Sequence, residues 1–336
     1  MRLLVSVGVQ DKLRGINDGQ KTSLAAVGIV DWDEKRLVQS DTYRPPDSIL
    51  HPDENVRTAF GSLRGDWYYA CAPTEVVRYR VPDLTRESVF SHPTFNDLHH
   101  VLALEDRILV CNTGLEMLQT FDYAGNLLDA YNASSTPTWE RFSLHDDYRL
   151  QPTTKPHECH INYVFVYEDK TWVTRFLQKD AVCVSDPSDR MPVDVGNPHD
   201  GVVIGDEIWF TTTNGHIVVV DGPNRRIARD IDLNAIKHTK GLVQLGWCRG
   251  LEVQNGFAYV GFSRFRQTKF REFASWVKHS GGPRYPARIE KIDLRKEELV
   301  DEFELEPFGA VVFGVNAIPR QPAKRREPDV AEQEAR

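Results

Sequence analysis

One strand–turn–strand pattern recurs along the chain, and it restricts the possible folds more than any other feature of the sequence. Around His199 the pattern is a loop, a polar pair, a strand, a tight Gly-Asp turn and a second strand. Segment 97–110 aligns with it without a gap and brings His99 onto His199. Segment 248–260 brings Arg249 to the same position, and its Asn-Gly pair falls on the turn. Repeated units of this size, each with a polar residue at one shared position, predict a β-propeller.

The remaining strand-like runs predict six blades of about 40–60 residues each. Residues 1–44 supply three such runs, one fewer than a four-stranded blade needs, and in the second blade the first strand is expected over 58–63. The run 311–318 can provide the missing strand, so the two ends of the chain are expected to share a blade and close the ring. We therefore expect an all-β fold, a six-bladed β-propeller over 1–319. The charged segment 320–336 is expected to be disordered.

Net charge and cysteine content restrict the partners and the compartment. The chain has 336 residues and a formal net charge of −8, which argues against general binding to nucleic acids or anionic membranes. No apolar run approaches the roughly 20 residues of a transmembrane helix, so no membrane partner is expected. Five cysteines without paired spacing are typical of reduced thiols, and we expect a cytoplasmic protein. The sequence leaves the oligomeric state open.

The shared polar position predicts a ring of histidines at one end of the central channel. Inner strands of a propeller converge on the axis, so side chains at equivalent positions of different blades should lie close together. Imidazoles from three strands can bind Fe, Mn, Zn or Cu, and a three-histidine set leaves coordination positions open for water and substrate. The predicted ligands of this divalent transition metal are His99, His100, His160 and His199. The alternative is that these imidazoles only satisfy buried polar groups and channel waters.

Charged and amide side chains near the same position predict a site for a small anionic substrate. Arg249 is expected to clamp a carboxylate or phosphate of that substrate. The predicted catalytic groups are Arg249, Asp200 and Glu158, and Asp200 or Glu158 would orient an imidazole or transfer a proton. Further candidates for contact with the substrate are Asn162, Asn316 and Arg264.

An insertion at about 264–287 interrupts the sixth blade. Its basic residues, and its aromatic residues at helical spacing, predict a short amphipathic helix. This helix either forms a lid over the channel mouth, with Arg264 or Arg266 meeting the substrate, or packs on blade six as an ordinary surface helix. The sequence does not distinguish these two arrangements.

Three strand motifs resemble those of a known protein family. Segment 158–162 reads Glu-Cys-His-Ile-Asn, segment 198–201 reads Pro-His-Asp-Gly, and segment 246–264 contains Arg-Gly-Leu-Glu and Val-Gly-Phe-Ser. Over about residues 95–265 the chain is similar to a bacterial group of predicted six-bladed propellers of unassigned function. It departs from the pattern of that group at Cys248, where a threonine would be expected. The resemblance implies the fold and supplies no reaction.

Two hypotheses about function follow. The first is a metal-dependent enzyme that acts on a small anionic substrate at the histidine-lined channel mouth, with lyase, isomerase, hydrolase and oxygenase chemistry all open. The second is a non-catalytic propeller that binds a ligand or a protein partner through the same face. Because six-bladed propellers include enzymes and pure scaffolds, the fold does not choose between them.

Overall fold

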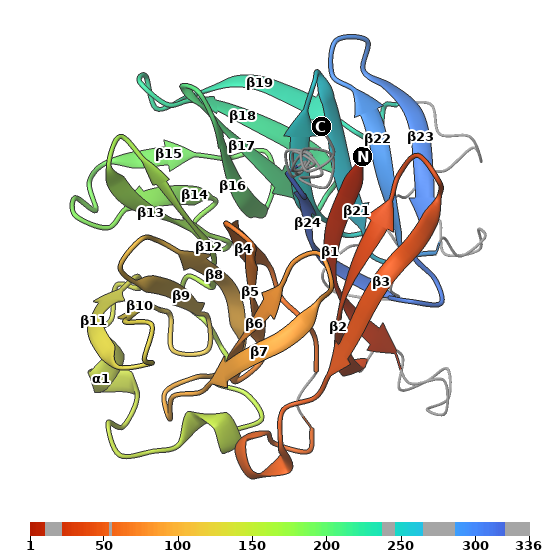
Figure 1. Ribbon diagram of the computed structural model, residues 1–336. Helices are drawn as coiled ribbons and strands as arrows, with labels where there is room; N and C mark the ends of the chain where they lie inside the picture. The colour runs from red at the N-terminus through yellow and green to blue at the C-terminus, as the bar shows by residue number, and fades with distance from the viewer. Residues whose placement is uncertain (11–21, 54–55, 237–245, 265–285, 320–336) are drawn as a thin grey trace, which may run out of the picture.

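The computed structural model describes residues 1–10, 22–53, 56–236, 246–264 and 286–319, which form a ring of six four-stranded antiparallel sheets (Figure 1). The strands of each blade are given from the inner strand outward. Blade one consists of β24 (Val311–Ala317), β1 (Arg2–Gln10), β2 (Thr22–Asp31) and β3 (Arg36–Tyr43), and blade two of β4 (Gly61–Arg64), β5 (Trp67–Ala72), β6 (Glu75–Arg80) and β7 (Thr85–Phe90). Blade three consists of β8 (Leu98–Ala103), β9 (Ile108–Asn112), β10 (Met117–Phe121) and β11 (Leu127–Asn132). Blade four consists of β12 (Ile161–Tyr167), β13 (Lys170–Arg175), β14 (Asp180–Cys183) and β15 (Arg190–Pro192), and blade five of β16 (Pro198–Ile204), β17 (Glu207–Thr212), β18 (His216–Asp221) and β19 (Arg226–Asp232). Blade six consists of β20 (Cys248–Gln254), β21 (Phe257–Phe262), β22 (Arg288–Asp293) and β23 (Glu298–Glu304). The predicted six-bladed propeller is confirmed.

The two ends of the chain close the ring, as predicted. The C-terminal strand β24 is the innermost strand of blade one and pairs antiparallel with β1, with Leu4 opposite Asn316 and Val5 opposite Val315. The N-terminal strands therefore depend on a segment more than 300 residues away for their inner edge. Closure of this kind covers a sheet edge that would otherwise lie open at the channel.

Short helical turns lie in the described connections between strands, and these are η2 (Asp47–Ile49), α1 (Thr138–Arg141) and η3 (Tyr148–Leu150). Within the described ranges, no helix has the length and apolar character needed to cross a bilayer. The helix predicted for the insertion falls on 265–285, and the predicted disordered segment is 320–336. Both lie outside the residues that the structure describes.

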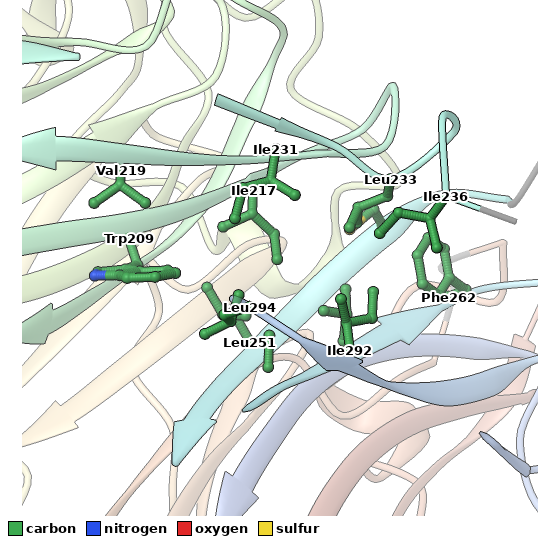
Figure 2. Close-up of a cluster of buried hydrophobic side chains, with 13 residues drawn as sticks. Trp209, Ile217, Val219, Ile231, Leu233, Ile236, Leu251, Phe262, Ile292 and Leu294 are labelled. Atoms are coloured by element: carbon green, nitrogen blue, oxygen red, sulfur yellow. The ribbon is translucent and has the colours of Figure 1, made fainter. Parts of the chain in front are cut away.

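Apolar side chains packed between neighbouring blades form the core. Figure 2 shows the cluster between blades five and six, where Trp209 and Ile217 pack with Leu251 and Phe262, each at most 7% exposed. Burying one large apolar side chain contributes about 1.5–3 kcal/mol to folding. Because such clusters lie along the blade interfaces, they hold the inner strands at fixed positions around the axis.

Hydroxyl groups tie several blades to the inner strand of the next blade. Thr174 Oγ1 on blade four donates to the carbonyl oxygen of Asp200 on blade five, at 2.8 Å. Ser263 Oγ on blade six donates to the carbonyl oxygen of Val312 on blade one, at 3.3 Å. Buried hydrogen bonds of this kind are costly to break, because the acceptor loses its partner without gaining water. They fix the first residues of the inner strands.

Candidate functional site

A small cavity lies where the inner strands begin. Its walls come from all six blades and consist of Phe60, His99, Asn162, Tyr163, His199, Asp200, Arg249 and Phe313. Four of these residues occupy the second position of their inner strands, namely His99, Asn162, His199 and Arg249. The cavity volume is about 10 Å³, which is room for about one water molecule or one oxygen atom of a ligand. A ligand can therefore place only a terminal group inside it.

A break in the strand pairing accompanies these side chains in blades five and six. The register of β16 with β17 shifts after His199, and Asp200 has a φ of +65°. The register of β20 with β21 shifts one position earlier, after Cys248, and Gly250 has a φ of +80°. Left-handed backbone suits glycine, and aspartate tolerates it better than most residues. Because such bulges re-aim side chains, they orient the polar residues at the channel end.

Arg249 supplies the positive charge of the described cavity wall. Its guanidinium lies over the rings of Trp247 and Phe313, at 4.9 and 5.1 Å from their centroids. The side chain is buried, with 8% exposed. Arg57 lies over the same Phe313 ring at 5.4 Å and forms an ion pair with Asp97. Stacking on aromatic faces stabilises a guanidinium, whose N–H donors point outward in the plane of the group.

Asp200 is a buried carboxyl group beside this cation. Its Oδ2 accepts hydrogen bonds from Thr211 Oγ1 and, at 3.2 Å, from the backbone N–H of Gly250 on blade six. Burial raises the pKa of Asp200 to about 7, although Thr211, Gly250 and the Arg249 charge each oppose the rise. A carboxyl group in this range can give or take a proton near neutral pH.

Three imidazoles lie near the same channel end but do not converge on one point. The rings of His99 and His160 meet edge to face, with centroids 4.8 Å apart. The Phe176 ring contacts both His160 and His199, at centroid distances of 5.2 and 5.4 Å. Nδ1 of His160 is 2.9 Å from Nδ1 of His157, and Nδ1 of His99 donates to the carbonyl oxygen of Asp97. One ring nitrogen of His99 and one of His160 are therefore already hydrogen-bonded within the protein.

His100, a predicted metal ligand, has a different role. It does not line the cavity. Its Nδ1 accepts the backbone N–H of Val164 on blade four, at 3.0 Å, and its ring stacks on Tyr163 with centroids 3.8 Å apart. Burial lowers the pKa of His100 to about 3, so the ring is neutral at ordinary pH. These contacts join blade three to blade four.

The described donors are not arranged as a transition-metal centre. Across the described ranges, no group of three or more His, Cys, Asp or Glu side chains is placed to hold a metal ion. Of the predicted ligands, His99 and His199 line the cavity, whereas His160 and His100 make the contacts given above. The residues therefore do not fit the predicted centre as they stand.

Stability is expected to fall in mild acid. Burial holds the pKa of six imidazoles below the usual value, and these are His92, His99, His100, His157, His160 and His199. Unfolded histidines take up protons below about pH 6.5, so each such group destabilises the folded state by about 1.4 kcal/mol per pH unit below that point. Asp200 acts in the opposite sense, because its raised pKa favours the folded state as the pH falls through 7. Urea unfolding should give a free energy of unfolding that is lower at pH 5 than at pH 7.5 by at least about 2 kcal/mol. Equal free energies at the two pH values would contradict the burial of these histidines in the neutral form.

The structure places three predicted site residues away from the cavity. The Glu158 carboxylate accepts from Ser135 Oγ and from the backbone N–H of Thr136, at 3.0 and 3.2 Å, so it fixes the connection after β11. Arg264 forms a two-pronged ion pair with Glu306. The contacts of Glu158 and Arg264 are therefore structural, and neither residue lines the cavity.

The third residue is Asn316, which was predicted at the cavity position of blade one. Phe313 lies there instead, three residues earlier on β24. In blade four, His160 was predicted at the cavity position, and Asn162 lies there instead. His160 precedes β12 and has a φ of +53°. Among the lining residues, Phe60, Tyr163 and Phe313 were not predicted. In blade two, the position that is polar in other blades is occupied by Phe60. This aromatic residue could have indicated that rings, as well as polar groups, line this end of the channel.

Comparisons with known proteins support the fold. No protein-family model matches the chain, and no curated protein matches it in sequence. A protein of unknown function from Bacteroides caccae is similar in structure, with a TM-score of 0.61 at 12% identity over 95% of this chain and 99% of that one. A chain from a nidogen/laminin complex gives a TM-score of 0.52 at 8% identity over 94% and 98% of the two chains. At such identities the likeness shows a six-bladed β-propeller, and the similarity of the strand motifs to a bacterial family remains a resemblance.

Proposed function

We propose that this protein is a small-molecule-binding β-propeller that receives the carboxylate of an anionic ligand at Arg249, at the channel end where the inner strands begin. One observation carries the proposal. Arg249 is the positively charged member of the described cavity wall, and rings from two different segments hold it beside the cavity. The neighbouring imidazoles are neutral because burial lowers their pKa values, so they add hydrogen-bonding groups without adding charge.

The charge of the site selects for a compact anion with one negative charge. Arg57 is neutralised by its ion pair with Asp97. Asp200 carries a partial negative charge near neutral pH. A ligand with one carboxylate brings a single negative charge to Arg249, whereas a multiply charged ligand would place further negative charge beside Asp200.

The same site can be read as catalytic or as purely binding. Asp200 is the described group best suited to proton transfer, because it is buried beside Arg249 and its pKa lies near neutrality. Once a ligand is known, following its ¹H NMR spectrum with time separates the two cases. Conversion that stops in Asp200→Asn would indicate an enzyme, and an unchanged spectrum would indicate a binding protein.

A bound transition metal remains a prediction from the sequence. The donor arrangement does not favour it, since one nitrogen of His99 and one of His160 are already hydrogen-bonded within the protein. Elemental analysis of protein purified without chelator provides the test. About one equivalent of Fe, Mn, Zn or Cu, lost in a His160→Ala/His199→Ala variant, would replace the present proposal with the metal-dependent one.

Titration with small anions tests the proposed function. The panel is acetate, propionate, glycolate, lactate and inorganic phosphate, and the measurement is the heat of binding together with the shift in melting temperature. We expect at least one monocarboxylate to bind saturably and to raise the melting temperature, because a ligand that binds only the folded state stabilises it. No saturable binding of any monocarboxylate would contradict the proposal.

A further inference from the structure

Buried polar atoms of the cavity wall that lack a hydrogen-bond partner among the described residues include Oδ1 of Asn162 and Nε2 of His199. Their residues are 3% and 6% exposed. A buried polar atom without a partner costs about 1–3 kcal/mol, so native proteins rarely leave one unsatisfied. Two such atoms in the wall of one cavity indicate that the cavity holds a polar group.

The contacts of Asn162 define what this group must offer. Nδ2 of Asn162 donates to the carbonyl oxygen of Pro198, at 2.8 Å, and this bond fixes the orientation of the amide. Oδ1 is therefore the unpartnered atom, and it can only accept. The bond also ties the amide to the residue that precedes His199, which brings the two unpartnered side chains to one part of the wall.

His199 can complement the acceptor. Burial, together with the Arg249 charge, keeps the pKa of His199 well below its usual value, so the ring is neutral. In the tautomer that carries its proton on Nε2, the ring donates from that atom. A single hydroxyl can then donate to Asn162 Oδ1 and accept from His199 Nε2. An ammonium group cannot accept, and it would place a second positive charge beside Arg249.

We propose that the ligand is a 2-hydroxycarboxylate, with its carboxylate at Arg249 and its hydroxyl inside the cavity on Asn162 and His199. This inference rests on the proposed function and specifies its ligand class. The cavity volume of about 10 Å³ matches one hydroxyl oxygen. Adjacent carbons of such a ligand carry the anion and the hydroxyl, so one short molecule reaches both groups. A single water molecule could satisfy the same two atoms, and the test must separate these cases.

Matched pairs of ligands provide the test. Glycolate is compared with acetate, and lactate with propionate, by calorimetric titration of the full-length protein. Each hydroxy acid should bind at least about tenfold more tightly than its partner, because only the hydroxy acid supplies a ligand group that hydrogen-bonds the two buried polar atoms. In Asn162→Leu the preference should disappear while the weak binding of acetate remains. If this variant does not fold, His199→Phe replaces it, with the melting temperature of each variant measured first.

The titrations distinguish failure of the 2-hydroxycarboxylate proposal from failure of carboxylate binding at Arg249. Equal affinities within both pairs would show that the cavity holds only water, which overturns the 2-hydroxycarboxylate and leaves carboxylate binding at Arg249 intact. A preference that persists unchanged in a folded Asn162→Leu or His199→Phe variant would also overturn it. Binding of neither member of either pair would overturn the proposed function, and the ligand class with it.

Discussion

A chain that ends at Ala310 is expected to lose its cooperative folding transition. It lacks β24, the inner strand of blade one, which pairs with β1. Val312 and Val315 are fully buried on this strand, and Val311 is 5% exposed. Each such side chain contributes about 1.5–3 kcal/mol, so their loss alone approaches the roughly 5–15 kcal/mol that stabilises a whole domain. Near-UV circular dichroism during thermal unfolding measures the transition.

A chain that ends at Pro319 is the matched control. It keeps β24 and removes only 320–336, which lie outside the described residues. This control should melt within a few degrees of the full-length chain. A sharp transition at an unchanged temperature in the shorter chain would show that the ring does not depend on the shared blade.

Arg249→Met is expected to weaken the binding of a small carboxylate by about 10- to 100-fold. A hydrogen bond to a charged group contributes about 1.5–3 kcal/mol, and each 1.4 kcal/mol corresponds to a factor of ten in affinity. Methionine keeps much of the apolar packing against Trp247 and Phe313 while removing the charge. Calorimetric titration gives the affinity, and the melting temperature of the variant shows whether the fold is retained.

Arg107→Met is the control for the loss of one arginine. Arg107 is exposed and lies in the turn between β8 and β9, at the opposite end of the inner strand from His99. Its replacement should leave the affinity unchanged. Arg249→Lys should retain part of the binding, because lysine keeps the charge and loses the planar pair of donors. Equal affinity in wild type and a folded Arg249→Met variant would remove Arg249 from the site.

Local signals made most of the fold predictable from the sequence. The turns Gly205-Asp206 and Asn255-Gly256 and the strands beside them repeat at nearly constant spacing, so the blades could be counted. The strand β15 was not predicted, because it has only three residues and includes Pro192. In blade two the first strand begins at Gly61 and not at residue 58. The backbone N–H of Phe60 donates instead to the carbonyl of His99 on the next blade, and such a long-range contact leaves no local signal.

The candidate site was predictable only in part. Alignment of the repeats brought His99, His199 and Arg249 together, and all three line the cavity. Asn316 and His160 do not line the cavity, because the inner strand begins earlier or later than the alignment assumed. Glu158 and Arg264 also lie away from it, held by partners 22 or more residues away in the sequence. Partners at such distances follow from the packing of the blades and not from local pattern.

A crystal structure of the protein with glycolate tests the proposed site most directly. We expect one glycolate at the channel end, with its carboxylate on the guanidinium of Arg249 and its hydroxyl within hydrogen-bond distance of Asn162 Oδ1 and His199 Nε2. A structure with glycolate bound elsewhere would contradict the assignment of this channel end as the binding site. A structure with the carboxylate at Arg249 and only water in the cavity would contradict the position proposed for the hydroxyl.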